Sequence, residues 1–151
     1  MPDPIFDTRT PRFDLPLLFA GQAQKEGFVN EVTARIDALL HCAVEAELAT
    51  PPATPAEGQS WLIAISPTGD WSGRPGQIAS RQSGNWLFAV PQPGMRVFNR
   101  GTGQTAFYNG SWQTASRPVS PSGGATVDVE ARDAIAALIG CLAAAGFVAA
   151  S

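Results

Sequence analysis

The sequence predicts an α+β protein with an N-terminal extended arm and helix, a small antiparallel β meander or roll, and a C-terminal helix. Three observations predict this class. Apolar residues follow a helical spacing towards the two ends of the 151-residue chain. The centre instead holds short alternating segments separated by Gly and Pro. All four Trp lie in that central part, where a compact β-domain needs apolar material for its core.

The first 48 residues predict an arm followed by a helix. Residues 1–20 contain four Pro and are expected to form an extended arm, because Pro lacks the backbone donor that helices and sheets use. Residues 21–48 predict a helix, with Asn30 as the cap of its main part. The end of this range, residues 44–48, alternates between apolar and acidic side chains and also fits a strand. The Pro-rich residues 50–58 predict a stiff linker.

The central region predicts six short strands that complete one helix-plus-β domain over residues 21–115. We expect these strands near residues 60–65, 77–82, 85–90, 95–99, 104–108 and 111–114. Asn109-Gly110 is the strongest hairpin signal, because a type I′ turn needs a positive φ at both central positions. Ser83-Gly84 gives a weaker signal for a second hairpin.

Residues 116–125 predict a second linker, and residues 126–151 predict a C-terminal helix. Asp128 fits the N-cap, Glu130 suits the first turn, and Gly146 fits the C-cap. The apolar stripe of this helix is Ile135, Leu138, Ile139 and Leu142, and a second register follows a heptad pattern with Ala131, Ile135, Leu138, Leu142 and Ala145. The pattern fits either an ordinary core helix or a short coiled coil between subunits.

Residue types that carry catalysis or bind metals are scarce. The chain has a single His, His41, and two isolated cysteines, Cys42 and Cys141, whereas a structural zinc site normally needs four such ligands. No nucleophile elbow, phosphate-binding loop or dinucleotide-binding motif is present. Asp70 is the sole acid between residues 59 and 115, which argues against the paired carboxylates of a glycosidase. We therefore expect no enzyme activity, no catalytic residue, no cofactor and no metal, and we expect His41 and both thiols to be packed.

The central region also fits a binding surface. It holds four Arg against one Asp, together with every Trp of the chain. Exposed aromatic rings and Arg bind sugars or anionic polymers by stacking and charge-assisted hydrogen bonds, although the same rings also suit a β-domain core. The candidate polysaccharide-binding residues are Trp71, Arg74, Arg81 and Tyr108. Trp71 lies in a turn-rich segment and is expected to be the most exposed Trp.

Nucleic acid and membranes are not expected partners. The chain has one Lys, no basic run and a net charge of −3. No apolar run reaches the ~18–20 residues of a membrane span, and the N-terminus does not resemble a secretory signal.

Short segments in a fixed order extend through most of the chain. They include Leu15-Pro16-Leu17-Leu18, Gly21-Gln22-Ala23-Gln24-Lys25, Asn30-Glu31, Pro55-Ala56-Glu57-Gly58, Gly69-Asp70-Trp71-Ser72-Gly73, Gly84-Asn85-Trp86-Leu87-Phe88 and Asn109-Gly110-Ser111-Trp112. This ordered set, over about residues 13–145, resembles a domain family of unknown function from alphaproteobacterial tailed phages, prophages and gene transfer agents. The domain occurs there in head-spike, tail-fibre and host-specificity proteins.

The resemblance implies a structural component of a phage-like particle. The chain would be made in the cytoplasm and incorporated as a homotrimer or homopentamer, linking a capsid or baseplate protein to a host-binding spike or fibre protein. Residues 1–20 would anchor it, and residues 126–148 would oligomerise or hold the fibre. The alternatives are an adhesin module that itself binds capsular polysaccharide, and a tail-fibre component. The sequence does not separate head from tail attachment.

Overall fold

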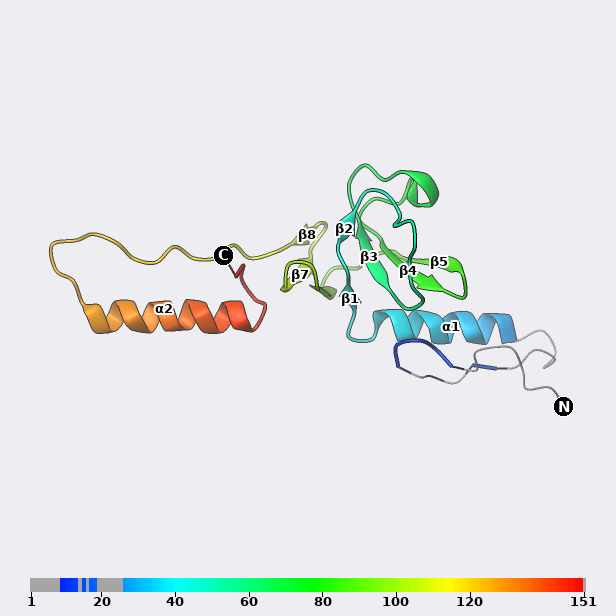
Figure 1. Ribbon diagram of the computed structural model, residues 1–151, viewed down its shortest axis with the longest axis horizontal. Coiled ribbons are helices and arrows are strands. Elements are labelled where there is room, and N and C mark those ends of the chain that lie inside the picture. Colours follow the sequence, from blue (N-terminus) through cyan, green and yellow to red (C-terminus); the bar gives the residue numbers. More distant parts are fainter. Residues whose placement is uncertain (1–8, 14, 16, 19–25, 151) are drawn as a thin grey trace. The chain divides into compact units, whose positions relative to one another are not determined.

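The computed structural model describes residues 9–13, 15, 17–18 and 26–150, in which two α-helices and eight strands are found (Figure 1). The chain divides into two compact units, Met1–Pro91 and Gln92–Ser151. The predicted α+β class is confirmed, with one helix near each end of the chain. The central strands were expected to form one meander, but they are divided between the two units.

The first unit is built on the sheet β2-β3-β4-β5, which has only one parallel pair. Its elements are α1 (Glu26–Leu39), β1 (Ala43–Val44), β2 (Glu47–Leu48), β3 (Ser60–Ile63), a short 3-10 helix (Gly69–Trp71), β4 (Ile78–Gln82) and β5 (Asn85–Ala89). Strand β2 pairs in parallel with β3, and the other two pairs are antiparallel. Parallel strands cannot be joined by a tight hairpin. The Pro-rich residues 50–58 form most of the longer connection between β2 and β3.

Both predicted hairpins are present, but only the one with the weaker sequence signal has a type I′ turn. In β4–β5, Gln82 pairs with Asn85, so the loop has two residues. Ser83 and Gly84 have φ values of 50° and 72°, as a type I′ turn requires. In the second unit, the loop after Tyr108 has three residues, and of these only Gly110 has a positive φ, of 85°. The type I′ prediction at Asn109-Gly110 is therefore wrong, because the pairing of Tyr108 with Trp112 sets a longer loop.

Helix α1 is shorter than the predicted helix. It ends at Leu39, and His41 then has a φ of 46°, which turns the chain into β1 and β2. Asn30 lies within α1 rather than capping it. Its side chain accepts from the backbone N–H of Leu18 at 2.8 Å and donates to the Leu18 carbonyl at 3.0 Å. Residues 21–25 of the predicted helix lie outside the described residues.

The carboxylate of Asp37 holds the described part of the predicted arm against α1. This side chain is 1% exposed and accepts hydrogen bonds from Thr10 Oγ1 at 2.6 Å and from the backbone N–H of Phe13 at 2.7 Å. The N–H of Arg12 adds a third bond, at 3.2 Å. The remaining arm positions, residues 1–8, 14, 16, 19 and 20, lie outside the described residues.

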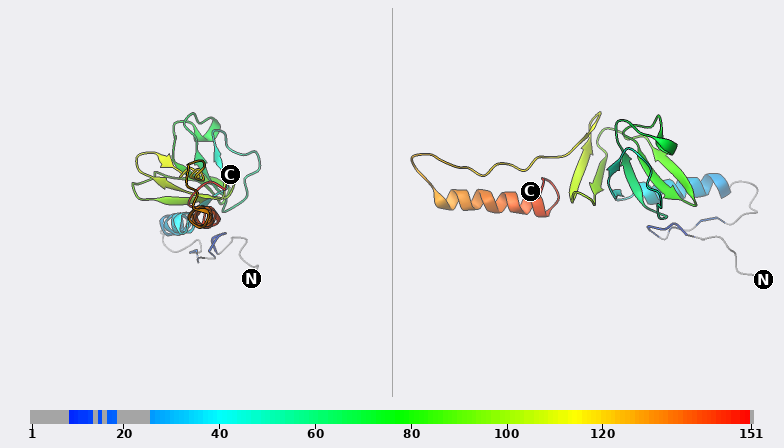
Figure 2. Two further views of the ribbon diagram at one scale, coloured as in Figure 1. Left: turned by 90° about the vertical axis from the view of Figure 1, so that its left-hand side faces the viewer. Right: turned by 45° about the horizontal axis from the view of Figure 1, so that its top comes forward.

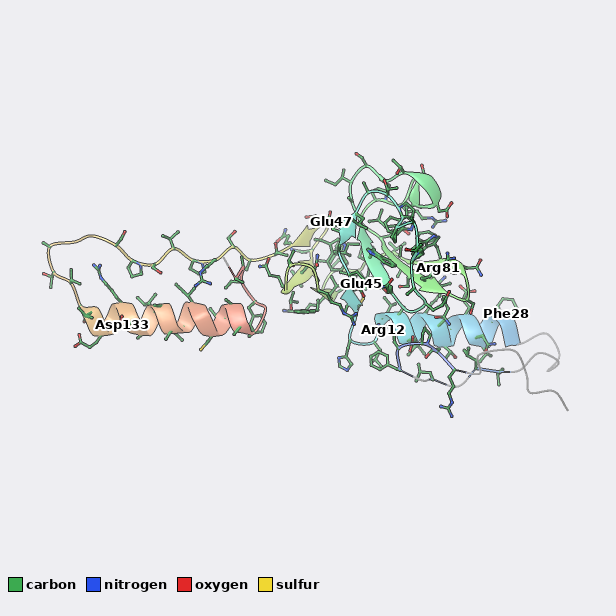
Figure 3. All side chains as sticks on the ribbon, in the orientation of Figure 1. Arg12, Phe28, Glu45, Glu47, Arg81 and Asp133 are labelled. Carbon is green, nitrogen blue, oxygen red and sulfur yellow. The ribbon has the colours of Figure 1, made fainter. Side chains whose placement is uncertain are left out.

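Arg12 also caps the C-terminal end of α1. Its guanidinium donates to the carbonyls of Asp37, Ala38 and His41 at 2.7, 2.7 and 3.1 Å. The last turn of α1 contains no basic residue of its own, so the arm supplies the cation that this end of the helix dipole favours (Figure 3).

The second unit contains three antiparallel strands and the C-terminal helix. They are β6 (Arg96–Asn99), β7 (Gln104–Tyr108), β8 (Trp112–Gln113) and α2 (Val129–Ala144). The segment between β8 and α2 runs back along the helix (Figures 1 and 2). Together with β3, β4 and β5 of the first unit, these three strands confirm all six predicted central strands.

Both predicted caps of α2 are confirmed. Asp128 accepts from the backbone N–H of Ala131 at 2.8 Å. At the other end, Gly146 has a φ of 72°, and the N–H groups of Gly146 and Phe147 donate to the carbonyls of Ala143 and Leu142. This is the Schellman motif. A Cβ at position 146 would lie 2.9 Å from the Gly103 carbonyl oxygen, so the close contact also requires glycine.

We predict that Asp37→Ala lowers the free energy of unfolding by about 2–4 kcal/mol, because it leaves three donors without their charged acceptor. The variant should also be cut faster by trypsin at Arg12. Glu31→Ala is the control, since it removes an acid of the same helix whose exposed ion pair with Arg35 contributes little. Urea denaturation and limited proteolysis measure both effects. Equal, small losses in the two variants would contradict the anchoring role of Asp37.

Candidate functional site

Three tryptophan rings meet on one face of the first unit's sheet. The ring centroids of Trp71 and Trp86 are 5.2 Å apart, and those of Trp61 and Trp86 are 5.7 Å apart, each pair at an interplanar angle of 77°. Trp61 and Trp71 are 6.3 Å apart. Edge-to-face contacts of this kind stabilise aromatic cores beyond the area they bury. Trp61 and Trp71 are therefore buried in the core of the unit with Ile63 and Ala79, and the half-buried Trp86 packs against them.

Trp71 is completely buried, so the expectation that it is the most exposed Trp is wrong. The turn-rich segment folds as the 3-10 helix Gly69–Trp71, which leaves Asp70 exposed and directs Trp71 into the core. In this conformation Trp71 cannot stack on a sugar. Its role is to support, from the core, the sheet that carries Arg81.

Arg74 and Arg81 cover aromatic rings of β5. The guanidinium carbon of Arg74 lies 4.0 Å from the centroid of Phe88, and that of Arg81 lies 5.2 Å from the centroid of Trp86. Trp86 and Phe88 alternate on β5 and so share a face, and Arg81 pairs directly with Trp86. The arginines occupy ring faces that would otherwise be open to a sugar. Their N–H edges can still bind carboxylate or sulfate groups of an anionic polymer.

Tyr108 belongs to the second unit. It is half-buried in the β7–β8 hairpin and packs edge-to-face on Trp112, with centroids 5.1 Å apart. The structure thus brings Trp71, Arg74 and Arg81 together around β5, whereas Tyr108 lies in a separate unit. Arg96 repeats the same stacking in the second unit, 5.4 Å from the centroid of Phe107.

The histidine and one cysteine differ from expectation. Cys42 is buried, and burial raises the pKa of its thiol to about 11, against the opposing charge of Arg12. Cys141 and His41 are exposed, so the prediction that both are packed is wrong. Cys141 lies in α2 and His41 follows the end of α1. The sequence did not show which side of either helix faces solvent. Among the described residues, no group of three or more His, Cys, Asp or Glu is placed to hold a metal ion.

Helix α1 presents an apolar face to solvent, which we call the α1 stripe. Its members recur at helical spacing and are Phe28, Val29, Val32, Ile36 and Leu40. Phe28, labelled in Figure 3, is 79% exposed, and Val32 is 57% exposed. A shallow groove of about 410 Å³ lies along the stripe and is also lined by Leu39. The other sides of α1 are used within the unit, since Asp37 binds the arm and Arg35 donates to the Phe88 carbonyl.

Helix α2 presents a second apolar face, formed by the heptad residues predicted from the sequence. We call Ala131, Ile135, Leu138, Leu142 and Ala145 the α2 stripe, and all five are exposed. Leu138 is 64% exposed, whereas Ile139, beside it in the sequence, is 5% exposed. The sequence pattern predicted the residues of the α2 stripe but not their exposure, because apolar spacing looks the same on a core face and on a docking face.

We predict that Trp71→Ala lowers the free energy of unfolding by about 3–5 kcal/mol, the range for removing a large aromatic side chain from a core. Arg74→Ala, the control, removes an exposed side chain next to the same cluster and should cost less than about 1 kcal/mol. Urea denaturation followed by circular dichroism gives both values. An unchanged stability of Trp71→Ala would show that its ring is not part of the core.

Comparison with known protein families finds a match for this chain but assigns no activity to it. The model of a family described as protein of unknown function, DUF2793, matches residues 29–113. The match begins in α1 and ends in β8, so it includes the tryptophan cluster and the strands of the second unit. No curated protein matches the chain. No helix within the described residues is long and apolar enough to cross a membrane. Because the match covers more than half of its length, the chain belongs to the DUF2793 family of proteins of unknown function.

Proposed function

We propose that the chain is a non-enzymatic structural component of a phage-like particle. In this role it is the base of a head spike or fibre, and it links a capsid or baseplate protein to a host-binding fibre and so supports adsorption. The observation that carries the proposal is the pair of exposed apolar helix faces, the α1 stripe in the first unit and the α2 stripe in the second. A component that joins an assembly needs contact surfaces outside its own core, and these stripes supply one in each unit.

The α1 stripe has the character of an interface. Its five apolar side chains extend over about 18 Å of helix, since each residue rises 1.5 Å. Contiguous exposed apolar surface of this kind marks contact sites in soluble proteins. The ion pair between Glu31 and Arg35 borders the stripe and suits the polar rim that surrounds an apolar interface.

The low charge of the chain supports assembly into a cyclic homo-oligomer, a trimer or a pentamer. Charged residues make up 15% of the sequence, well below the roughly 25% usual for soluble domains. Depletion of charge is typical of surfaces that become buried between subunits. The resemblance of the ordered sequence segments to domains of alphaproteobacterial phages and gene transfer agents supports a particle as the place of assembly.

The contacts of Asp37 decide which N-terminal deletion should be used to test the anchoring role proposed for residues 1–20. A deletion of residues 1–14 would remove Thr10, Arg12 and Phe13, the three partners of Asp37, and would leave that carboxylate buried without donors. A deletion of residues 1–8 keeps all three, so any loss of incorporation would come from the deleted residues rather than from a damaged helix.

We predict that the wild-type chain co-purifies with particles from a producing culture and that Val32→Glu does not, because a charge on the α1 stripe resists burial. Quantitative mass spectrometry of purified particles, with the major capsid protein as reference, measures incorporation. Several copies at each capsid vertex would indicate a head spike, and a few copies per particle would indicate the tail.

Gly27→Glu is the matched control for Val32→Glu. It adds the same charge to the first turn of α1, where no atom lies within 4 Å of an added Cβ, and it should be incorporated normally. Circular dichroism should show both variants folded, since Val32 is already more than half exposed. Particles that lack the wild-type chain would overturn the proposal.

A second candidate function, a polysaccharide-binding adhesin, is favoured by the two stacked arginines. Arg74 and Arg81 lie on neighbouring rings of one sheet face and together present two guanidinium groups. We predict that the isolated chain binds acidic capsular polysaccharide in a salt-sensitive manner and that Arg74→Ala with Arg81→Ala abolishes the binding. Arg96→Ala is the control, because it removes a similarly stacked arginine from the second unit. A capsule pull-down in which the wild-type chain does not bind would exclude this candidate.

A further inference from the structure

The α2 helix contacts its own chain through a side that differs from the α2 stripe. Ile139 is buried, and Arg132 and Ala143, its neighbours on that side, are partly buried. Arg132 donates to the carbonyl of Gly123, in the segment that runs back along the helix (Figure 2). At 3.6 residues per turn, the α2 stripe lies about a quarter of a turn away from this side. The stripe is therefore left free by the fold of a single chain.

The stripe has the repeat that allows a helix to pack against copies of itself. Its spacings of four and three residues place Ile135 and Leu142 at a positions, and Ala131, Leu138 and Ala145 at d positions. In a coiled coil, each of these side chains enters a hole formed by the same repeat on the facing helix. A second copy of this chain supplies that repeat, and the small Ala residues at either end allow close approach of the helices.

The distribution of charge in α2 favours parallel copies. Glu130, Arg132 and Asp133 all lie in the first turns, and residues 134–150 contain no charged side chain. In an antiparallel pair, the charged turn of one helix would lie against the apolar end of the other and lose water without gaining partners. In a parallel bundle, the charged turns stay together at one solvated end, and apolar turns meet apolar turns. In a cyclic trimer or pentamer, helices packed along the symmetry axis are parallel, because rotation about that axis keeps their direction.

We propose that copies of this chain assemble through a parallel, in-register bundle of their α2 helices, with the α2 stripe at its centre. This inference rests on the proposed function, because a fibre base present in several copies needs a contact between those copies. It assigns the α2 stripe to self-association and leaves the α1 stripe for another component of the particle.

Cys141 provides a native probe of this bundle. It is exposed in the single chain and lies between Leu138 and Leu142, at the border of the α2 stripe. Cys42 is buried with a raised thiol pKa, so near neutral pH it reacts slowly with alkylating reagents. Alkylation and cross-linking of the full chain therefore report mainly on Cys141, and Cys141→Ser gives the background from Cys42.

The test compares the full-length wild type with Leu138→Glu and Ala137→Glu. These variants place the same charge at adjacent residues, the first on the α2 stripe and the second on another exposed side of the helix. Sedimentation velocity should show an oligomer for the wild type and for Ala137→Glu, and a monomer for Leu138→Glu. Circular dichroism should show all three folded, because Leu138 is 64% exposed in the single chain.

Cysteine chemistry then tests the arrangement of the helices. Alkylation of Cys141 in the wild type should be roughly tenfold slower than in Leu138→Glu, as expected for a side chain covered by assembly. A short bis-maleimide should join Cys141 of neighbouring copies, because a parallel, in-register bundle places them at one level. Absence of this cross-link in an oligomeric wild type would overturn the parallel arrangement.

The possible outcomes distinguish a failure of this inference from a failure of the proposed function. A wild-type chain that enters particles but stays monomeric in solution, with Cys141 as reactive as in Leu138→Glu, would overturn the inference alone. An oligomer that survives Leu138→Glu would also overturn it, since the contact would then lie elsewhere. A chain that forms the predicted bundle but is missing from purified particles would support self-association through α2 and overturn the proposed function.

Discussion

The mutual packing of Trp61, Trp71 and Trp86 is the interaction on which the first unit depends. The three rings come from β3, from the 3-10 helix and from β5, so their contact joins segments that are separate in the sequence. A strand shifted by one residue would direct its Trp to the opposite face of the sheet. The cluster therefore selects the register of the sheet as well as filling its core.

The same cluster decides what the surface of this unit can bind. With Trp71 buried, the tryptophan cluster offers no open stacking platform, and Arg74 and Arg81 cover Phe88 and Trp86. The remaining chemistry is that of two guanidinium groups held in place by rings, which suits anionic groups better than neutral sugars. A tryptophan-rich sequence thus encodes a rigid support, and its arginines provide the surface chemistry.

The helices contrast with this closed core. Each helix is held by side-chain hydrogen bonds within its own unit, from Asp37 to the arm for α1 and from Asp128 to the first turn for α2. Each helix nevertheless keeps an apolar stripe in solvent. Because both helices are otherwise well anchored, we propose that partners cover this exposed apolar surface. Two such stripes on a stable fold are the physical basis for the proposed linking role and for the different roles proposed for α1 and α2.

The α+β class, the six central strands and both caps of α2 could be predicted from the order of the residues alone. These features depend on residues close together in the chain, such as the carboxylate of Asp128 three residues before Ala131 and the φ that Gly146 adopts freely. The burial of Trp71, the bonds from the arm to Asp37 and the exposure of the two stripes became visible only in the folded chain. These depend on contacts between segments distant in sequence, and apolar periodicity identifies a helix face without identifying what will cover it.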